Sequence, residues 1–414
     1  MNTTKKVLII GQVWPEPTSS AAGTRMMQLI ELFRDFSYTI TFASTATSGE
    51  HSAALPAEIL TESITLNSDS FDDFISKNHF DIVIYDRFMI EEQFGWRVGR
   101  QLPNAVRILN TEDLHSLRSA REICRKRNVP FSIQQMKRED ITKREVASIL
   151  RCDMTLMVSS FEIELLVGTF TIDRNLLFYL PLFFAKNSGT PEIGFSKRKD
   201  FIFIGNFYHR PNKDAVRFLK TSIWPQLKDS VPEASMQIYG AYPDSEVLQM
   251  TNKRDRFFVN GRADDANLLV AQSRVVLAPL RFGAGIKGKL LEAMANGTPS
   301  VTTEIGAEGI SEADLWPGIV ADDQEQFISG AATLYADEAK WQAAHETGFD
   351  ILQRTFSREH YAESFRGRLA DLIDNLDEHR SLNFFGEMLH FHTLRSTEYL
   401  SRWIEEKQKK SRHF

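Results

Sequence analysis

Cysteine is scarce in this sequence, which has only Cys124 and Cys152 among its 414 residues. Two cysteines make a disulfide framework implausible and suit a reducing compartment, so we expect a cytoplasmic protein. Cysteine and histidine nowhere stand together at the spacing of metal ligands. We therefore expect neither a structural metal ion nor a bound cofactor.

Long apolar runs and an excess of basic charge are also lacking. The run at residues 7–11, within MNTTKKVLIIG, has only the length of a strand, so we expect no signal peptide and no membrane span there or elsewhere. Any membrane contact is then expected to be peripheral, at the inner face. The formal net charge of −6 gives no global basic field, so nucleic acid is not expected as a partner.

The turn after this first expected strand lacks the Gly-x-Gly-x-x-Gly fingerprint of dinucleotide-binding proteins. In its place is QVWPEPTSSAAGTR, a loop rich in proline and small residues. A nucleotide-sugar epimerase or another dinucleotide-dependent enzyme is therefore disfavoured. Ligands of open α/β sheets bind beyond the carboxyl ends of the strands, so this loop is a candidate part of a site, although it could be a plain connection.

What the sequence does have is a repeated alternation of apolar strands and amphipathic helices. This pattern predicts an α/β fold with doubly wound sheets, and 414 residues are enough for two such domains. A polar stretch rich in glycine, proline and serine predicts a linker between them. The predicted ranges are a Rossmann-like N-terminal domain over 1–184, a linker over 185–200, a Rossmann-like second domain over 201–380 and a helical extension over 381–414.

The most informative stretch is RVVLAPLRFGAGIKGKLLEAMANG, residues 274–297. It predicts a buried strand, a turn containing Gly283 and Gly285, and a helix that begins near Ile286 and ends at Gly297. The first amides of a helix have no partner within the helix, and the helix dipole places partial positive charge there. The turn is therefore a candidate anion site.

Two lysines and one glutamate refine this expectation. Lys287 and Lys289 add positive charge where the dipole already disfavours cations, which favours a phosphate between them. Glu292, on the same helix, can accept hydrogen bonds from both hydroxyl groups of a ribose. The alternative is a surface lysine pair on an ordinary turn, with Glu292 only pairing with Lys289.

KLLEAMANGTPSVTT, residues 289–303, resembles the C-terminal signature of retaining glycosyltransferases of the GT-B fold, in particular glycosyltransferase family 4. The resemblance implies two Rossmann-like domains that face a cleft, with the nucleotide sugar on the second domain. It places Glu292 on the nucleotide ribose. The family's usual second glutamate, eight residues earlier and near the donor sugar, is Ala284 here.

The resemblance also implies site residues at other turns of the second domain. The turn in FIFIGNFYHRPN matches the family's domain start, where the backbone of Gly205 and the basic Arg210 would approach the diphosphate. A guanidinium can hold phosphate oxygens in a bidentate fork. Arg210 could instead be an exposed turn residue. Gly261 and Arg262 follow a later strand, at the level where the nucleotide base would bind.

In the first domain, polar residues follow the strand at 106–110. The resemblance places His115 beside the donor sugar, although a lone histidine bound to Asp113 could be purely structural. Gly23 and Arg25, after the first loop, would lie near the donor phosphates or the acceptor. We assign Gly23, Arg25 and Asp113 to the acceptor side of the cleft.

We therefore predict a glycosyltransferase that moves a sugar from a UDP- or GDP-linked donor to a glycan, a lipid-linked glycan or a protein, in the setting of polysaccharide biosynthesis. Negative charge develops on the departing diphosphate, and Arg210, Lys287 and Lys289 could stabilise it. No Asp-x-Asp motif is present, so we expect metal-independent chemistry. The resemblance implies retention of anomeric configuration. The alternative is a catalytically silent nucleotide-sugar-binding or scaffold protein, which Ala284 keeps open.

The last segment, residues 382–414, is aromatic at first and ends in the basic KQKKSRHF. Three roles are open for it: packing back onto the first domain, forming a homodimer, or resting on a membrane surface.

Overall fold

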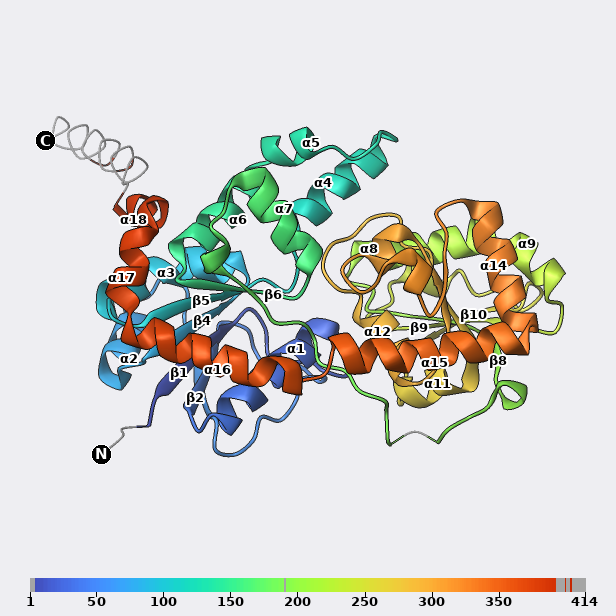
Figure 1. The fold of residues 1–414 in the computed structure, drawn as a ribbon, viewed down its shortest axis with the longest axis horizontal. Helices are drawn as coiled ribbons and strands as arrows, with labels where there is room; N and C mark the ends of the chain where they lie inside the picture. Colours follow the sequence, from blue (N-terminus) through green and yellow to red (C-terminus); the bar gives the residue numbers. More distant parts are fainter. Residues whose placement is uncertain (1–3, 190, 392–398, 400–402, 404–414) are drawn as a thin grey trace, which may run out of the picture.

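The computed structural model describes residues 4–189, 191–391, 399 and 403. Two parallel sheets, each covered by helices on both faces, lie side by side (Figure 1). The doubly wound organisation predicted from the sequence is confirmed. Within the described residues, no helix is long and apolar enough to reach across a bilayer.

The first sheet has the strand order β3-β2-β1-β4-β5-β6-β7, with parallel pairing between neighbours. Its strands are β1 (Lys6–Gly11), β2 (Thr39–Ser44), β3 (Leu60–Ser63), β4 (Ile82–Asp86), β5 (Val106–Asn110), β6 (Met154–Met157) and β7 (Leu177–Tyr179). Its helices are α1 (Ala21–Asp35), α2 (Ser70–Asn78), α3 (Phe88–Gln101), α4 (His115–Lys126), α5 (Ile133–Arg138), α6 (Asp140–Arg151) and α7 (Ser160–Phe170).

The second sheet repeats the same winding in the order β10-β9-β8-β11-β12-β13. Its strands are β8 (Lys199–Ile204), β9 (Met236–Tyr239), β10 (Phe257–Gly261), β11 (Ser273–Ala278), β12 (Ser300–Thr302) and β13 (Gly318–Val320). The following helices are α8 (Arg210–Phe218), α9 (Trp224–Ser230), α10 (Ser245–Leu248), α11 (Ala266–Gln272), α12 (Gly288–Ala295), α13 (Glu304–Ala307), α14 (Gln324–Ala336) and α15 (Glu338–Thr355), with a π-helical turn at Leu219–Ile223.

The strands are apolar throughout because both of their faces are buried. In β1, Leu8 and Ile10 join the core on one side of the first sheet, whereas Val7 and Ile9 join the core on the other side. This alternation follows from the two-residue period of a strand. Helices on both faces leave the carboxyl ends of the strands as the place where polar loops gather.

The chain returns to the first domain after α15. Helix α16 (Glu359–Asp374) buries Phe365 and Leu369 in the core formed by α1, and the ring of Phe365 lies edge-on to Phe33 at 5.8 Å. Figure 1 shows α15 and α16 running one after the other along both domains. Helix α16 therefore packs with the first sheet, whereas the sequence-based ranges count residues 201–380 with the second.

The C-terminal helices α17 (Leu376–Leu382) and α18 (Phe384–Phe391) extend this return. Arg380 forms an ion pair with the buried Asp153, with Nε at 2.7 Å from Oδ1. Asn383 donates to the carbonyl of Leu150 at 2.7 Å. Phe384 and Phe391 stay exposed on the outer side of α18, at 70% and 86%. The basic end at 407–414 lies outside the described residues.

Candidate functional site

A cavity of about 630 Å³ lies between the two domains, at the carboxyl ends of both sheets. Its first-domain wall includes Thr18, Arg87, Glu112, Asp113, His115 and Arg118, and its second-domain wall includes Gly205, Asn206, Arg262, Ala284, Lys289 and Glu292. Loops that are far apart in the sequence therefore form one site, as expected for open α/β sheets.

The beginning of α12 provides most of the second-domain wall. Lys289 and Glu292 are half-buried and both line the cavity. Nζ of Lys289 donates to Oδ1 of Asn212 at 2.5 Å and lies 4.3 Å from the ring centre of Phe203. Burial lowers the pKa of Lys289 to about 7, against the opposing effect of Glu292, and burial also raises the pKa of Glu292. Both groups thus face the cavity without the solvation that normally stabilises their charges.

Lys287 caps the beginning of α12 but is not part of the cavity wall. Its Nζ donates to the carbonyl of Gly285 at 2.7 Å, and its side chain is buried. Burial lowers its pKa to about 8, although the carboxylate of Glu308 acts in the opposite direction. The sequence pattern starts this helix near Ile286, and the structure starts it at Gly288.

The glycine turn before α12 brings the domains into contact. Gly285 has a φ of +63°, and a Cβ built on it would lie 2.7 Å from Cβ of Asp113. Its N–H donates to Oε1 of Glu162 at 2.7 Å. The carbonyl of Gly283 accepts from Nη1 of Arg121 at 2.8 Å. These glycines therefore join the two domains and do not line the cavity, although their neighbour Ala284 does.

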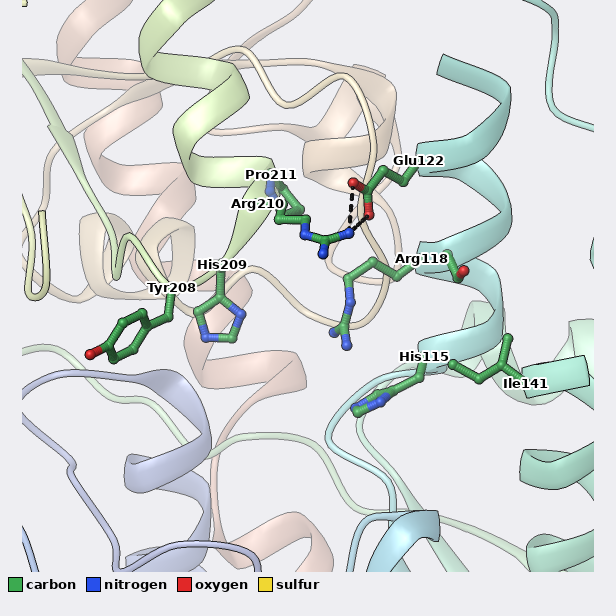
Figure 2. A pocket seen from close by; sticks show the side chains of 9 residues that line it. His115, Arg118, Glu122, Ile141, Tyr208, His209, Arg210 and Pro211 are labelled. Carbon is green, nitrogen blue, oxygen red and sulfur yellow. Dashed lines mark hydrogen bonds and ion pairs between the residues drawn. The ribbon is translucent and has the colours of Figure 1, made fainter. Parts of the chain in front are cut away.

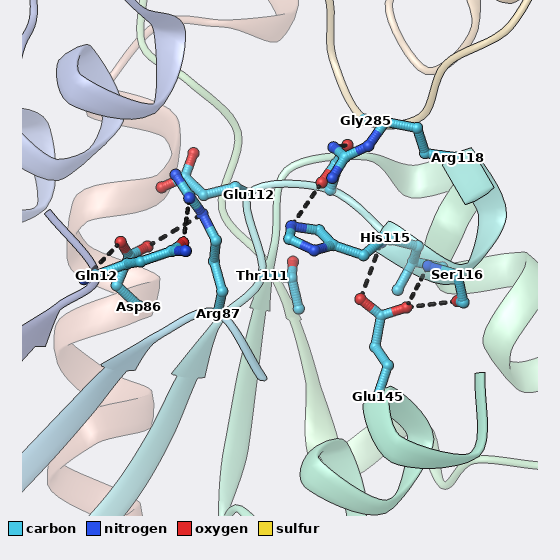
Figure 3. A network of polar contacts seen from close by, with 12 residues as sticks. Gln12, Asp86, Arg87, Thr111, Glu112, His115, Ser116, Arg118, Glu145 and Gly285 are labelled. Carbon is cyan, nitrogen blue, oxygen red and sulfur yellow. Dashed lines mark hydrogen bonds and ion pairs between the residues drawn. The ribbon is translucent and has the colours of Figure 1, made fainter. Parts of the chain in front are cut away.

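On the first-domain wall, a buried carboxylate fixes the beginning of α4 (Figure 3). Glu145, from α6, accepts the N–H groups of His115 and Ser116, each at 2.9 Å. Burial raises the pKa of Glu145 to about 7. His115 is thereby held at the cavity, with its Nε2 at 3.4 Å from Oδ1 of Asp113.

Asp113 and His115 form a short polar chain with Arg118, which contacts the other carboxylate oxygen of Asp113. Burial opposes the charge of Asp113, but Arg118 and His115 bring its pKa below the usual range. Burial lowers the pKa of His115 to about 4, although Asp113 acts in the opposite direction. His115 is therefore neutral at pH 7 and can donate or accept a hydrogen bond.

Two cavity residues that the sequence analysis did not select have strained backbones. Arg87 and Glu112 have φ values of +76° and +61°, in the left-handed region that side chains rarely adopt. Both follow the last residue of a strand within two positions, and Asn110 donates to Oε1 of Glu112 at 2.8 Å. Burial raises the pKa of Glu112 to about 8. Their positions just after β4 and β5 are the sequence feature that could have marked both residues as candidates for the cavity wall.

The structure separates two of the predicted acceptor-side residues from the cavity. Arg25 is a fully buried residue of α1, and its Nη1 donates to the carbonyl of Pro181 at 3.0 Å. Burial lowers its pKa to about 10. Gly23 is packed against the backbone of Glu16, where a Cβ would come within 2.3 Å. Neither residue lines the cavity, whereas Asp113 does.

Of the remaining residues predicted for the second-domain site, some line the cavity and others do not. Gly205 lines the cavity, and a Cβ there would lie 2.6 Å from Nζ of Lys289. Arg262 also lines it and donates to Oγ1 of Thr18 across the domains at 3.1 Å. Gly261 lies outside the wall, and its carbonyl accepts from the N–H of Gly240 at 2.8 Å.

Arg210 lies in a second, smaller chamber beside the main cavity (Figure 2). It begins α8, and its Nη1 is 3.1 Å from Oε1 of Glu122 on α4. The chamber has a volume of about 260 Å³ and shares His115, Arg118 and His209 with the main cavity.

Residues 198–337 match the family described as Glycosyl transferases group 1. This segment makes up most of the second domain, which is thus similar to that family. It contains Gly205, Lys289 and Glu292 and thus forms one wall of the cavity. A comparison with curated protein sequences gave no match.

Among solved structures, the chain is similar to sucrose-phosphate synthase from Thermosynechococcus elongatus, with a TM-score of 0.67, 15% identity and coverage of 89% of this chain and 99% of that chain. HepE of Anabaena in complex with UDP matches with a TM-score of 0.64, 12% identity and coverage of 89% and 100%. WaaG, a glycosyltransferase involved in lipopolysaccharide biosynthesis, matches with a TM-score of 0.61, 13% identity and coverage of 89% and 99%. These likenesses confirm the predicted GT-B fold.

Proposed function

We propose that this protein is a glycosyltransferase that moves a sugar from a nucleotide sugar to an acceptor in the cavity between its domains. The observation that carries the proposal is the pair of half-buried ionisable side chains, Lys289 and Glu292, at the beginning of α12 in a cavity of about 630 Å³. HepE of Anabaena was solved with UDP-glucose, which supports a nucleotide-sugar donor. We keep both UDP- and GDP-linked sugars as candidates.

We assign the nucleotide to the second domain. Glu292 would accept the ribose hydroxyl groups, and Lys289 with the first amides of α12 would hold the diphosphate. Gly205 leaves room for that diphosphate because any side chain would meet Lys289. Arg262 lies where the base would bind, and Lys287 remains a predicted phosphate ligand whose Nζ would leave the carbonyl of Gly285.

The donor sugar would lie between Ala284 and the first-domain wall. A neutral His115 can donate to a sugar hydroxyl, and Asp113 fixes its ring. Breaking the bond from the anomeric carbon to phosphate places negative charge on the leaving diphosphate, which Lys289, Lys287 and the helix amides would stabilise. The proposal includes retention of anomeric configuration, by attack on the same face with the leaving phosphate accepting the proton of the acceptor. It also includes independence from metal ions.

The acceptor would approach from the first domain. A glycan, a lipid-linked glycan or a protein fits the proposal, in polysaccharide assembly on the inner face of a cytoplasmic membrane. The exposed apolar face of α18, with the basic sequence at 407–414, supports contact with an anionic membrane surface. A homodimer through the same face is the competing proposal.

Donor turnover tests the proposal against a silent binding protein. Purified protein is incubated with UDP-glucose, UDP-N-acetylglucosamine and GDP-mannose, and release of free nucleoside diphosphate is measured. We expect slow hydrolysis of one donor, reduced at least tenfold in Glu292→Ala and unchanged in Glu338→Ala, an exposed glutamate on α15. Lys287→Ala should lower kcat more than donor affinity if its charge acts in the transition state. Donor binding without any turnover, even with acceptors added, would favour the silent alternative.

A further inference from the structure

The smaller chamber beside the donor cavity is a separate space with its own wall. Ser119, Glu122, Ile141, Tyr208, Arg210 and Pro211 line the chamber and not the main cavity. The two spaces meet at His115, Arg118 and His209. A molecule in the chamber would therefore lie next to the position proposed for the donor sugar.

Two guanidinium groups from opposite domains point into this chamber (Figure 2). Arg118 comes from α4 and Arg210 from the beginning of α8. Arg118 contacts Asp113, and Arg210 contacts Glu122, which also pairs with Lys126 at 2.6 Å. Among the residues that line the chamber, two arginines therefore stand against the single carboxylate of Glu122, so its wall carries an excess of positive charge.

The pair formed by Arg210 is readily exchanged for a ligand. The side chain of Arg210 is 71% exposed. Glu122 is only 13% exposed, but it keeps Lys126 as a partner when Arg210 turns to a ligand. An anion that accepts from Arg210 and Arg118 together would gain two charge-assisted contacts.

The two histidines at the junction are neutral and available for hydrogen bonds. Burial lowers the pKa of both His115 and His209 to about 4, and the positive charge of Arg118 lowers both further. Tyr208 adds an apolar surface at the edge: its ring is stacked on Tyr242 at 4.4 Å, and the side chain is 73% exposed. Aromatic and polar groups of this kind suit a saccharide.

We propose that this chamber is an acceptor subsite for a saccharide with an anionic group, a phosphate or a carboxylate, held by Arg118 and Arg210. The inference rests on the proposed function, because it uses the donor position to assign the chamber to the acceptor. Arg210 would then bind the acceptor and not the donor diphosphate, which the proposed function assigns to α12 and Lys289. The protein should therefore select acceptors that carry a negative charge.

Thermal stabilisation at constant ionic strength tests the assignment. The probes are glucose 6-phosphate, glucuronate and neutral glucose, each with and without UDP. We expect both anionic sugars to raise the Tm of the wild type and glucose to leave it unchanged. Arg210→Gln and Arg118→Gln should weaken the anionic sugars at least tenfold, whereas Arg217→Gln, an ion-paired arginine on the same helix, should not.

The outcomes separate this inference from the proposed function. UDP stabilisation without any response to the anionic sugars, or an equal response in Arg210→Gln and the wild type, overturns the acceptor subsite alone. Loss of UDP stabilisation in Arg210→Gln returns this arginine to the donor diphosphate and also overturns it. A response to the anionic sugars that depends on Arg210, without a response to any nucleotide, supports the anion site and contradicts the donor site.

Discussion

Lys289 is the residue at which the electrostatics of the cavity can be measured most directly. Burial and the contact with the ring of Phe203 leave its ammonium poorly hydrated, and its pKa falls to about 7. In the free protein at pH 7.5, a large fraction of the Lys289 side chains is therefore deprotonated and neutral. A diphosphate beside Nζ would favour the charged form and raise the pKa again.

Nucleoside diphosphate binding should therefore take up a proton between pH 7 and 8.5. Isothermal titration calorimetry in buffers with different ionisation enthalpies measures this uptake. We expect a positive proton uptake that is clearly smaller in Lys289→Met, which keeps the stem of the side chain, and that is unchanged in Lys253→Met, an exposed lysine. Binding with no proton uptake, or with the same uptake in Lys289→Met, would place the phosphates elsewhere.

At the scale of elements, the strand, turn and helix around residues 273–302 were predictable from the sequence, since an apolar run, glycines and a helical spacing all occur in one stretch. Residues 118–150 are less informative: their mixed charges at three- and four-residue spacing are typical of a solvated helix, but the structure divides the segment among three helices, α4, α5 and α6. Glu145, which caps α4, is read from sequence as an exposed charge and is in fact buried.

Sequence analysis found residues of the cavity wall only where a strand end or a motif marked them. Glu292, Lys289 and His115 lie on this wall, and their roles stay predictions. Arg25 does not lie on this wall, because its position on α1 points its side chain into the interior. The sequence before it resembles a loop, so it does not show which way a residue at this position on the helix will point. The strained backbone of Glu112 has no sequence signal at all.

Helix α18 presents the apolar face proposed to meet a membrane. Phe384, Phe385, Met388 and Phe391 are exposed at 70%, 63%, 43% and 86%. Because α17 and α18 are fixed to the first domain through Arg380 and Asp153, this face is part of the folded protein. In the proposed membrane contact, the basic sequence at 407–414 would add attraction to anionic lipids.

The triple variant Phe384→Ser, Phe385→Ser, Phe391→Ser should lose at least tenfold in co-sedimentation with vesicles of phosphatidylglycerol and phosphatidylcholine. Leu315→Ser, at an equally exposed leucine of the second domain, should sediment as the wild type does. Vesicles of phosphatidylcholine alone should bind weakly. A dimer in solution that the triple variant abolishes, with no vesicle binding by the wild type, would contradict the membrane proposal and favour self-association.

At the scale of the whole molecule, contacts between the domains enclose the site. Arg121 forms a two-point ion pair with Glu308, at 2.9 and 2.6 Å, and Glu162 accepts from Gly285. Helix α16 ties the end of the second domain to the core of the first. The cavity therefore lies where both domains meet, as the proposed reaction between two substrates held by different domains would require.

The most direct test of the central claim is thermal stabilisation by UDP, GDP, ADP and their sugar conjugates, measured on the wild type and on Glu292→Ala. A ligand that binds only the folded protein stabilises it by roughly 2.7 kcal/mol at one hundred times its Kd. The account predicts that one nucleotide series raises the Tm of the wild type and that Glu292→Ala loses most of this rise. A wild type that no nucleotide stabilises, or an equal rise in Glu292→Ala, would contradict a donor site at α12.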